Sequence, residues 1–144
     1  MLFSLNTKYK SNIFTAFLHS LDVKYTYSCA NKLYNEHPHK YNLLGLSCLL
    51  SEYKIDNAGL KFENKDDIID LEAPFIVHFS DDFVLVKKIL KKQVDFVWRG
   101  KDLTIPLDEF KAVWDGVILV AEKSKESIEP KYHENKKYDI IRFT

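Results

Sequence analysis

The alternation of apolar and polar residues is clearest around residue 80. Residues 73–79 and 83–89 are two apolar runs rich in β-branched and aromatic side chains, and the polar trio Ser80-Asp81-Asp82 separates them. This pattern predicts two antiparallel strands joined by a tight connection. A further run at residues 94–98 extends the hairpin to a three-stranded meander. Period-two alternation puts aromatic and aliphatic side chains together on a face of each hairpin strand: Phe75, Val77 and Phe79 in the first, and Phe83, Leu85 and Ile89 at odd positions of the second.

Three helical patterns precede this hairpin. Apolar residues at spacings of one, three and four predict an amphipathic helix that begins at Ser11, its N-cap, and ends near residue 22. A second helix is predicted over residues 25–34, with Ser28 as its cap, and a third over residues 43–53. The third pattern is apolar over a wide arc, so this helix is expected to be the most buried. Gly45 within it indicates a close approach by another element.

The remaining patterns complete an α+β domain. They predict a strand at residues 58–62, a helical turn near residues 64–71, a short strand at 103–105, a helix that follows Pro106, and a last strand at 117–121. We therefore expect three N-terminal helices packed on an antiparallel sheet, built from residues near 58–62, 73–79, 83–89, 94–98 and 117–121. Residues 1–122 form this domain. The charged residues 123–144 are expected to be a solvated linker or tail that leads towards a further, transmembrane segment.

Composition narrows the function classes. A chain of 144 residues is the size of one domain, and 21 Lys and Arg balance 21 Asp and Glu, which argues against a nucleic-acid binder. Cys29 and Cys48 belong to no CxxC cluster and are interpreted as reduced thiols of a cytosolic compartment. His37 and His39 flank Pro38 without further ligands at metal-binding spacing, so they are interpreted as turn residues. No metal or cofactor is predicted, and no apolar run is long enough to span a membrane.

Two sequence motifs carry a resemblance to a known family. The strand pair from Pro74 to Val86 resembles the family motif P-x-I-x-H followed by H-F-V-V-L. A closing L-x-E-F-x-x-x-W-x-G pattern is matched by Leu107, Glu109, Phe110, Trp114 and Gly116. Residues 9–122 thus resemble the bacteriocin-processing cysteine peptidase domain, a papain-like module at the N-terminus of peptide-exporting ABC transporters.

A variant of the family adds a second resemblance. His37-Pro38, followed by Leu43, Leu44 and Leu46, is similar to the domain fused to vitamin K epoxide reductase-like membrane proteins. Both resemblances imply a location at the cytoplasmic face of the bacterial inner membrane, with the membrane reached only through a segment absent from this sequence.

The resemblance implies a catalytic triad that this sequence lacks. An active member has a cysteine at the start of the first helix, a histidine base before the Phe-Val strand, and an orienting aspartate after the next strand. The corresponding positions here are Ser11, Asp82 and Trp98. Without a histidine, Ser11 is interpreted as an N-cap and not as a nucleophile.

The function that we expect is therefore binding without catalysis. An inactive papain-like domain retains a groove for an extended peptide, and the predicted groove residues are His78, Phe83 and Trp98. Its partner would be a peptide or leader peptide, or an adjacent transmembrane or redox domain. One alternative is an active cysteine peptidase that uses Cys29 or Cys48 to cleave leader peptides. Another is a spacer domain tethered to a membrane redox protein, with no ligand of its own.

Overall fold

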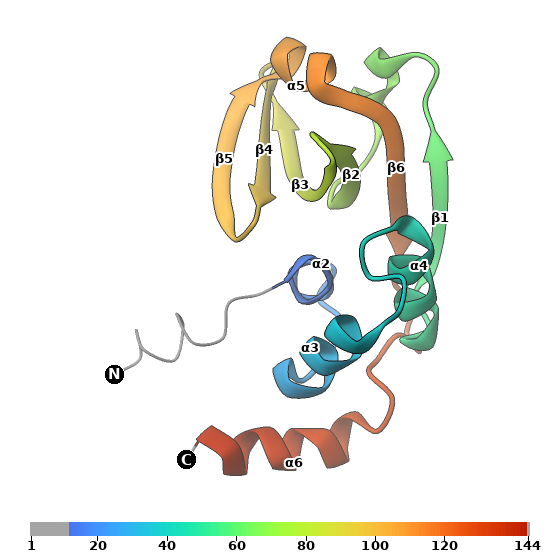
Figure 1. Cartoon of the computed structure of the whole chain (residues 1–144), viewed down its shortest axis with the longest axis vertical. Coiled ribbons are helices and arrows are strands. Elements are labelled where there is room, and N and C mark those ends of the chain that lie inside the picture. Colours follow the sequence, from blue (N-terminus) through green and yellow to red (C-terminus); the bar gives the residue numbers. More distant parts are fainter. Residues whose placement is uncertain (1–11, 144) are drawn as a thin grey trace.

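The computed structural model describes residues 12–143 of the chain. Three helices come first, a sheet follows, and a last helix ends the described part (Figure 1). The elements in chain order are α2 (Ile13–Ser20), α3 (Tyr27–Glu36), α4 (Leu43–Glu52), β1 (Asp56–Lys61), the 3-10 helix η1 (Lys65–Asp70), β2 (Phe75–Phe79), β3 (Asp82–Leu90), β4 (Gln93–Trp98), β5 (Lys101–Pro106), α5 (Leu107–Val113), β6 (Trp114–Glu122) and α6 (Tyr132–Phe143).

A six-stranded sheet in the order β1-β6-β2-β3-β4-β5 forms the centre of the fold, and all its neighbouring strands are antiparallel. The helices α2, α3 and α4 lie on one side of it, and α5 lies on the other (Figure 1). Each side has its own apolar core: Ile76, Leu85 and Leu119 pack with the three helices, whereas Phe96 and Trp114 pack with α5 and η1. The predicted α+β arrangement is confirmed, and β5 makes the sheet one strand wider than predicted.

The central hairpin has the predicted turn. Ser80 and Asp81 both have positive φ, 50° and 60°, which is the backbone of a two-residue hairpin connection. Phe75, Val77 and Phe79 share the core on the α5 side, as expected.

The second strand differs from strict alternation. Leu85 faces the helices but Ile89 packs on the α5 side, because the pairing of β3 with β4 shifts between Val86 and Lys88. A β-bulge of this kind inserts one residue and exchanges the two faces of the strand beyond it.

The helices begin where their caps allow. Asn12 caps α2: its Oδ1 accepts a hydrogen bond from the Thr15 amide at 2.8 Å, and its own amide donates to Thr15 Oγ1 at 3.0 Å. Ser11 lies outside the described residues. The N-cap of α3 is Thr26, so the prediction that Ser28 caps this helix is wrong.

The most buried helix is not α4. Four of the eight residues of α2 are buried, compared with four of the ten residues of α4, because α2 lies between the sheet and α3 (Figure 1). Cys48 of α4 is exposed. The close approach at Gly45 is present, because a Cβ there would overlap the His39 carbonyl.

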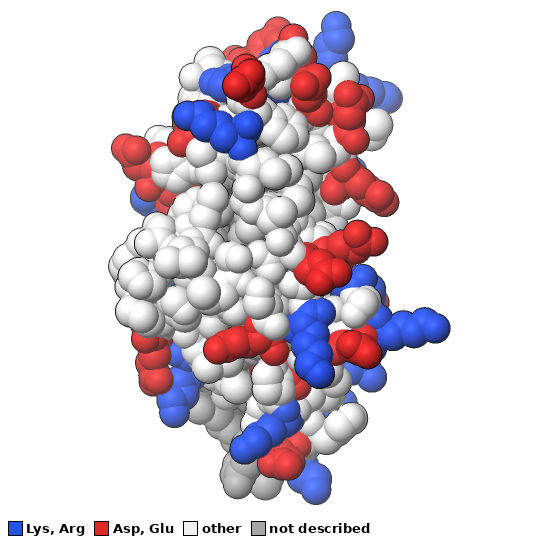
Figure 2. Space-filling view, turned by 90° about the vertical axis from the view of Figure 1, so that its right-hand side faces the viewer, with Lys and Arg blue, Asp and Glu red and all other residues white. Residues whose placement is uncertain are grey.

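Among the described strands, β1 forms one edge of the sheet and pairs with β6 alone. The side of the molecule that carries this edge has a broad uncharged area between charged side chains that gather towards its two ends (Figure 2). Exposed apolar residues of α4 and β1 include Leu44 and Leu60.

The segment after β6 is ordered against the helices, contrary to the expectation of a solvated linker or tail. Ile128 forms an isolated β-bridge with Lys24, and the side chain of Glu129 is 1% exposed. The turn that follows leads into α6, which lies below α3 in Figure 1. The domain boundary at residue 122 stays a prediction.

Candidate functional site

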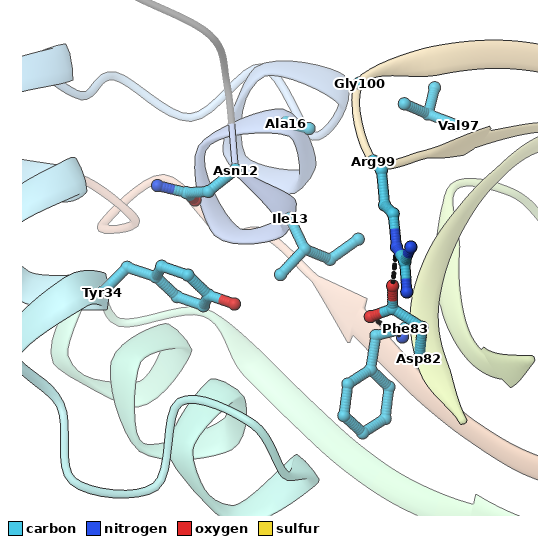
Figure 3. Close-up of a pocket in the computed structure, with 9 residues that line it drawn as sticks. All are labelled: Asn12, Ile13, Ala16, Tyr34, Asp82, Phe83, Val97, Arg99 and Gly100. Carbon is cyan, nitrogen blue, oxygen red and sulfur yellow. Dashed lines mark hydrogen bonds and ion pairs between the residues drawn. The ribbon is translucent and has the colours of Figure 1, made fainter.

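A cavity of about 180 Å³ lies where the start of α2 meets the β2–β3 hairpin and the β4–β5 turn. Figure 3 shows its walls, which come from segments far apart in the sequence. Four side chains are apolar, and the others bring an amide, a phenol, a carboxylate and a guanidinium to one small space. The lining residues are Asn12, Ile13, Ala16, Tyr34, Asp82, Phe83, Val97, Arg99 and Gly100.

The start of α2 forms one wall. Asn12 is held from two sides, because its Oδ1 caps α2 and its Nδ2 donates to Asn31 Oδ1 of α3 at 2.9 Å. Ile13, the first residue of α2, points its side chain towards Asp82 and Arg99 (Figure 3). The helix start therefore presents an apolar group to the cavity.

Asp82 is the centre of the opposite wall. Its Oδ1 accepts from the Phe83 amide at 2.8 Å, and its Oδ2 accepts from Trp98 Nε1 at 3.0 Å and from Arg99 Nε at 2.9 Å. The Arg99 guanidinium also lies over the Trp98 ring, 5.5 Å from its centroid. This cluster ties the first residue of β3 to the turn that follows β4.

These contacts determine the charge of Asp82. Burial would raise the pKa of this carboxyl, but the hydrogen bonds from Arg99, the Phe83 amide and Trp98 outweigh it and hold the pKa below its usual value. Burial raises the pKa of Tyr34, and the nearby Asp82 raises it further, so Tyr34 is a neutral phenol. At neutral pH the cavity thus contains an ionised carboxylate, which accepts from three donors, and a neutral hydroxyl.

A histidine and a carboxylate form a second polar pair beside the cavity. His78 Nδ1 lies 2.5 Å from Asp115 Oδ2, and Asp115 Oδ1 accepts from the Val117 amide at 3.0 Å. Burial would raise the pKa of Asp115, but the bonds from Val117 and His78 lower it overall. The His78 ring lies 5.3 Å from the ring of Phe83, which lines the cavity.

The predicted groove residues thus meet around one place. Phe83 lines the cavity, and the ring of His78 packs against the ring of Phe83. Trp98 donates to Asp82 and packs edge-on against Phe79, with ring centroids 5.5 Å apart. Asp82 lines the same cavity as Ile13 at the start of α2, and Trp98 reaches this place only through its hydrogen bond to Asp82.

Seven of the nine lining residues were not among the site residues predicted from the sequence: Asn12, Ile13, Ala16, Tyr34, Val97, Arg99 and Gly100. The only sequence signal was the helix start for Ile13 and the Arg99-Gly100 turn.

The thiols and the remaining histidines lie elsewhere. Within the described part of the chain, the cavity lining includes neither a cysteine nor a histidine. Cys29 is half-buried on α3 and Cys48 is exposed on α4. His37 Nδ1 accepts a hydrogen bond from the His39 amide at 3.0 Å, as in a local turn. Among the described residues, no three His, Cys, Asp or Glu side chains gather as a metal ion requires.

Comparison with known proteins shows the family of this chain. The model of the peptidase C39 family matches residues 14–126, more than half of the chain. The chain belongs to the peptidase C39 family. No curated protein sequence matches it significantly. None of the described helices is long and apolar enough to cross a membrane.

Solved structures share the fold at low identity. A double-glycine motif protease from an AMS/PCAT transporter, in complex with its leader peptide, is 19% identical; the match covers 78% of this chain and 81% of that one, with a TM-score of 0.68. The peptidase domain of Streptococcus ComA, a bi-functional ABC transporter involved in quorum sensing, is 17% identical over 84% and 86% of the two chains, with a TM-score of 0.57. The C39-like domain of a toxin secretion ATP-binding protein from Vibrio parahaemolyticus is 14% identical over 79% and 98%, with a TM-score of 0.58. The predicted papain-like peptidase fold is therefore confirmed.

Proposed function

We propose that this C39 domain binds a peptide and does not cleave it. The observation that carries the proposal is the cluster of Asp82, Trp98 and Arg99 facing Ile13 at the start of α2. Cysteine peptidase chemistry needs a thiolate at such a helix start and an imidazole base beside it. We assign those places in this cavity to an isoleucine and a carboxylate, Ile13 and Asp82.

The proposed assignment moves the nucleophile position from Ser11 to Ile13. Ile13 is the first residue of α2 and points at Asp82, whereas Ser11 precedes the capping residue Asn12. We assign Asp82 to the base position and Trp98 to the position of the orienting aspartate. The lowered pKa of Asp82 makes it a poor proton acceptor at neutral pH, because a base must have a pKa near the working pH.

The walls of the cavity suit a narrow peptide segment. Ile13, Ala16 and Val97 supply apolar contacts, and the Tyr34 hydroxyl offers a donor for a peptide carbonyl. A cavity of about 180 Å³ is small for a large side chain. A related protease has been solved with its leader peptide, and a leader peptide with small residues is the ligand that we propose. Attachment to a transporter, or to a vitamin K epoxide reductase-like protein at the inner face of a bacterial membrane, stays a prediction from the resemblance.

Incubation with fluorescent double-glycine leader peptides tests the proposal. We expect saturable binding by fluorescence anisotropy and no cleavage by mass spectrometry. Arg99→Ala should weaken binding, because it removes a cation from the cavity, whereas Lys101→Ala removes an exposed cation at the start of β5, two residues later, and should not.

Two results would overturn the proposal. Cleavage that disappears in a Cys29→Ala, Cys48→Ala double variant would establish an active cysteine peptidase. Absence of saturable binding would remove the peptide from the proposal and favour the spacer domain.

A further inference from the structure

A carboxylate from the C-terminal segment lies in the interior of the protein, beyond the residues that match the family model. Glu129 is 1% exposed, and the matched region ends at residue 126. The Oε1 atom of Glu129 accepts hydrogen bonds from the Thr26 amide at 3.1 Å and from the Tyr53 hydroxyl at 2.8 Å. Its Oε2 accepts from Thr26 Oγ1 at 2.7 Å and from Asn135 Nδ2 at 3.1 Å. These uncharged donors offset the cost of burying the carboxylate.

Backbone hydrogen bonds hold the same segment to two loops. The Glu129 amide donates to the Lys24 carbonyl at 3.0 Å, and the Ile128 amide donates to the Tyr53 carbonyl at 3.0 Å. Ser127 Oγ donates to the Lys54 carbonyl at 2.6 Å. The segment therefore joins the loop between α2 and α3 to the end of α4.

Tyr53 extends this contact into the core. Burial raises the pKa of Tyr53, and the adjacent Glu129 raises it further, so the phenol remains a hydrogen-bond donor. Its ring packs edge-on against Phe14 of α2, with centroids 5.2 Å apart. The helices α2, α3 and α4 thus all adjoin the place where Glu129 binds.

The helix α3 connects Glu129 to the cavity. Thr26 is the N-cap of α3, but its side chain binds Glu129 instead of capping the helix. Further along the same helix, Asn31 accepts from Asn12, and Tyr34 lines the cavity. A displacement of Thr26 would therefore be transmitted by one short helix to two residues of the site.

We propose that residues 127–135 form a clasp that sets the position of α3, so that a partner or a pull on α6 changes the shape of the cavity. The clasp itself is independent of the ligand. Its effect on peptide affinity rests on the proposed function. By linkage, a peptide that binds more tightly while the clasp is formed would also stabilise the clasp.

Hydrogen exchange of the full chain without peptide tests the clasp. Glu129→Ala leaves three buried donors and one half-buried donor, Asn135 Nδ2, without their acceptor. The loss of a hydrogen bond to a charged group corresponds to roughly a tenfold or larger change in the local opening equilibrium. We expect exchange to rise about tenfold or more in residues 124–137 and also in residues 27–36, with the β2–β3 hairpin unchanged. Glu126→Ala, which removes an exposed carboxylate from the same segment, is the matched control and should change neither region.

Each outcome decides the proposal. Faster exchange confined to residues 124–137 would show that the segment is a passive tail, and an equal effect of Glu126→Ala would show a general charge effect. If Glu129→Ala does not fold, Glu129→Gln keeps the shape but turns an amide towards the donors, and the same comparison applies. The leader-peptide affinity of these variants is measured separately, so failure of wild-type binding would refute the proposed function and leave the exchange result to decide the clasp.

Discussion

Asp82 is the residue whose replacement tests the site most directly. Phe83, Trp98 and Arg99 all donate to the two carboxylate oxygens of Asp82. Asp82→Asn keeps the shape of the side chain but replaces one of these acceptor oxygens with an NH₂ donor. Whichever way the amide is oriented, at least one donor faces another donor. The ion pair with Arg99 is also lost.

The expected cost follows from exposure. A hydrogen bond to a charged group contributes roughly 1.5–3 kcal/mol when it is buried. The side chains of Asp82 and Arg99 are 34% and 75% exposed, so solvent screens their attraction. We therefore expect Asp82→Asn to lower the free energy of unfolding by about 1–2 kcal/mol at pH 7.

Urea unfolding measures this cost against a matched neighbour. Asp81→Asn removes the same charge one residue earlier, at an exposed turn position with positive φ that asparagine tolerates. The urea concentration at the unfolding midpoint should fall for Asp82→Asn and stay nearly constant for Asp81→Asn. The dependence of the unfolding free energy on urea concentration should be the same for both variants. If the two variants are equally stable at pH 7, the cluster of Asp82, Trp98 and Arg99 does not form in solution.

The difference in stability between the Asp82→Asn and Asp81→Asn variants should depend on pH in a defined direction. The pKa of Asp82 is lower in the folded protein, so the unfolded chain binds more protons between the two pKa values. The stability from Asp82 is fully present above the unfolded value of about 3.9. It is lost as the pH falls through the folded pKa, so the difference between the variants should shrink below about pH 4.

Other predictions concern the core, one glycine and the thiols. Leu46 is 1% exposed, so Leu46→Ala should lower the free energy of unfolding, measured in urea, by about 2–5 kcal/mol. Leu44 is 58% exposed, so Leu44→Ala should lower it by less than about 1 kcal/mol. Equal losses would contradict the packing of α4. Gly116→Ala should lower the melting temperature, since the backbone has φ +93° and a Cβ would lie 2.8 Å from the Phe62 carbonyl oxygen, and an unchanged melting temperature would argue against this contact. Cys48 is exposed and should react with iodoacetamide before the half-buried Cys29, as mass spectrometry of the labelled peptides would determine; the reverse order would contradict their exposures.

Periodic patterns made the elements of the fold predictable. The helices near residues 13 and 43 and the hairpin around residue 80 follow from local apolar spacing and turn chemistry, so no tertiary information was needed. The face of Ile89 was wrong because a bulge changes the alternation without leaving a signal in the sequence. The burial of α4 was overestimated because its apolar arc includes Leu44, which is exposed.

The site and the C-terminal segment depend on long-range contacts. The strand motif was enough to locate Asp82. Ile13 and Arg99 line the same cavity although they are 86 positions apart in the sequence, so their proximity appears only in the folded chain. Glu129 stands in a charged segment whose composition is typical of solvated chain. Its donors, Thr26 and Tyr53, lie 103 and 76 residues away along the sequence, so only the folded structure identifies it as a buried residue.

The proposed loss of catalysis and the retention of a cavity have a common physical cause. In the pattern that the resemblance implies, a base on the strand is oriented by a carboxylate from the facing turn. Here the carboxylate, Asp82, is on the strand, and the turn carries the cation, Arg99, with Trp98 beside it. This pair joins β3 to the β4–β5 turn and forms one wall of the cavity. Because every partner of Asp82 is a donor, the carboxylate is stabilised in its ionised form. The contacts that keep the cavity in shape are therefore the same contacts that make proton transfer to Asp82 unfavourable.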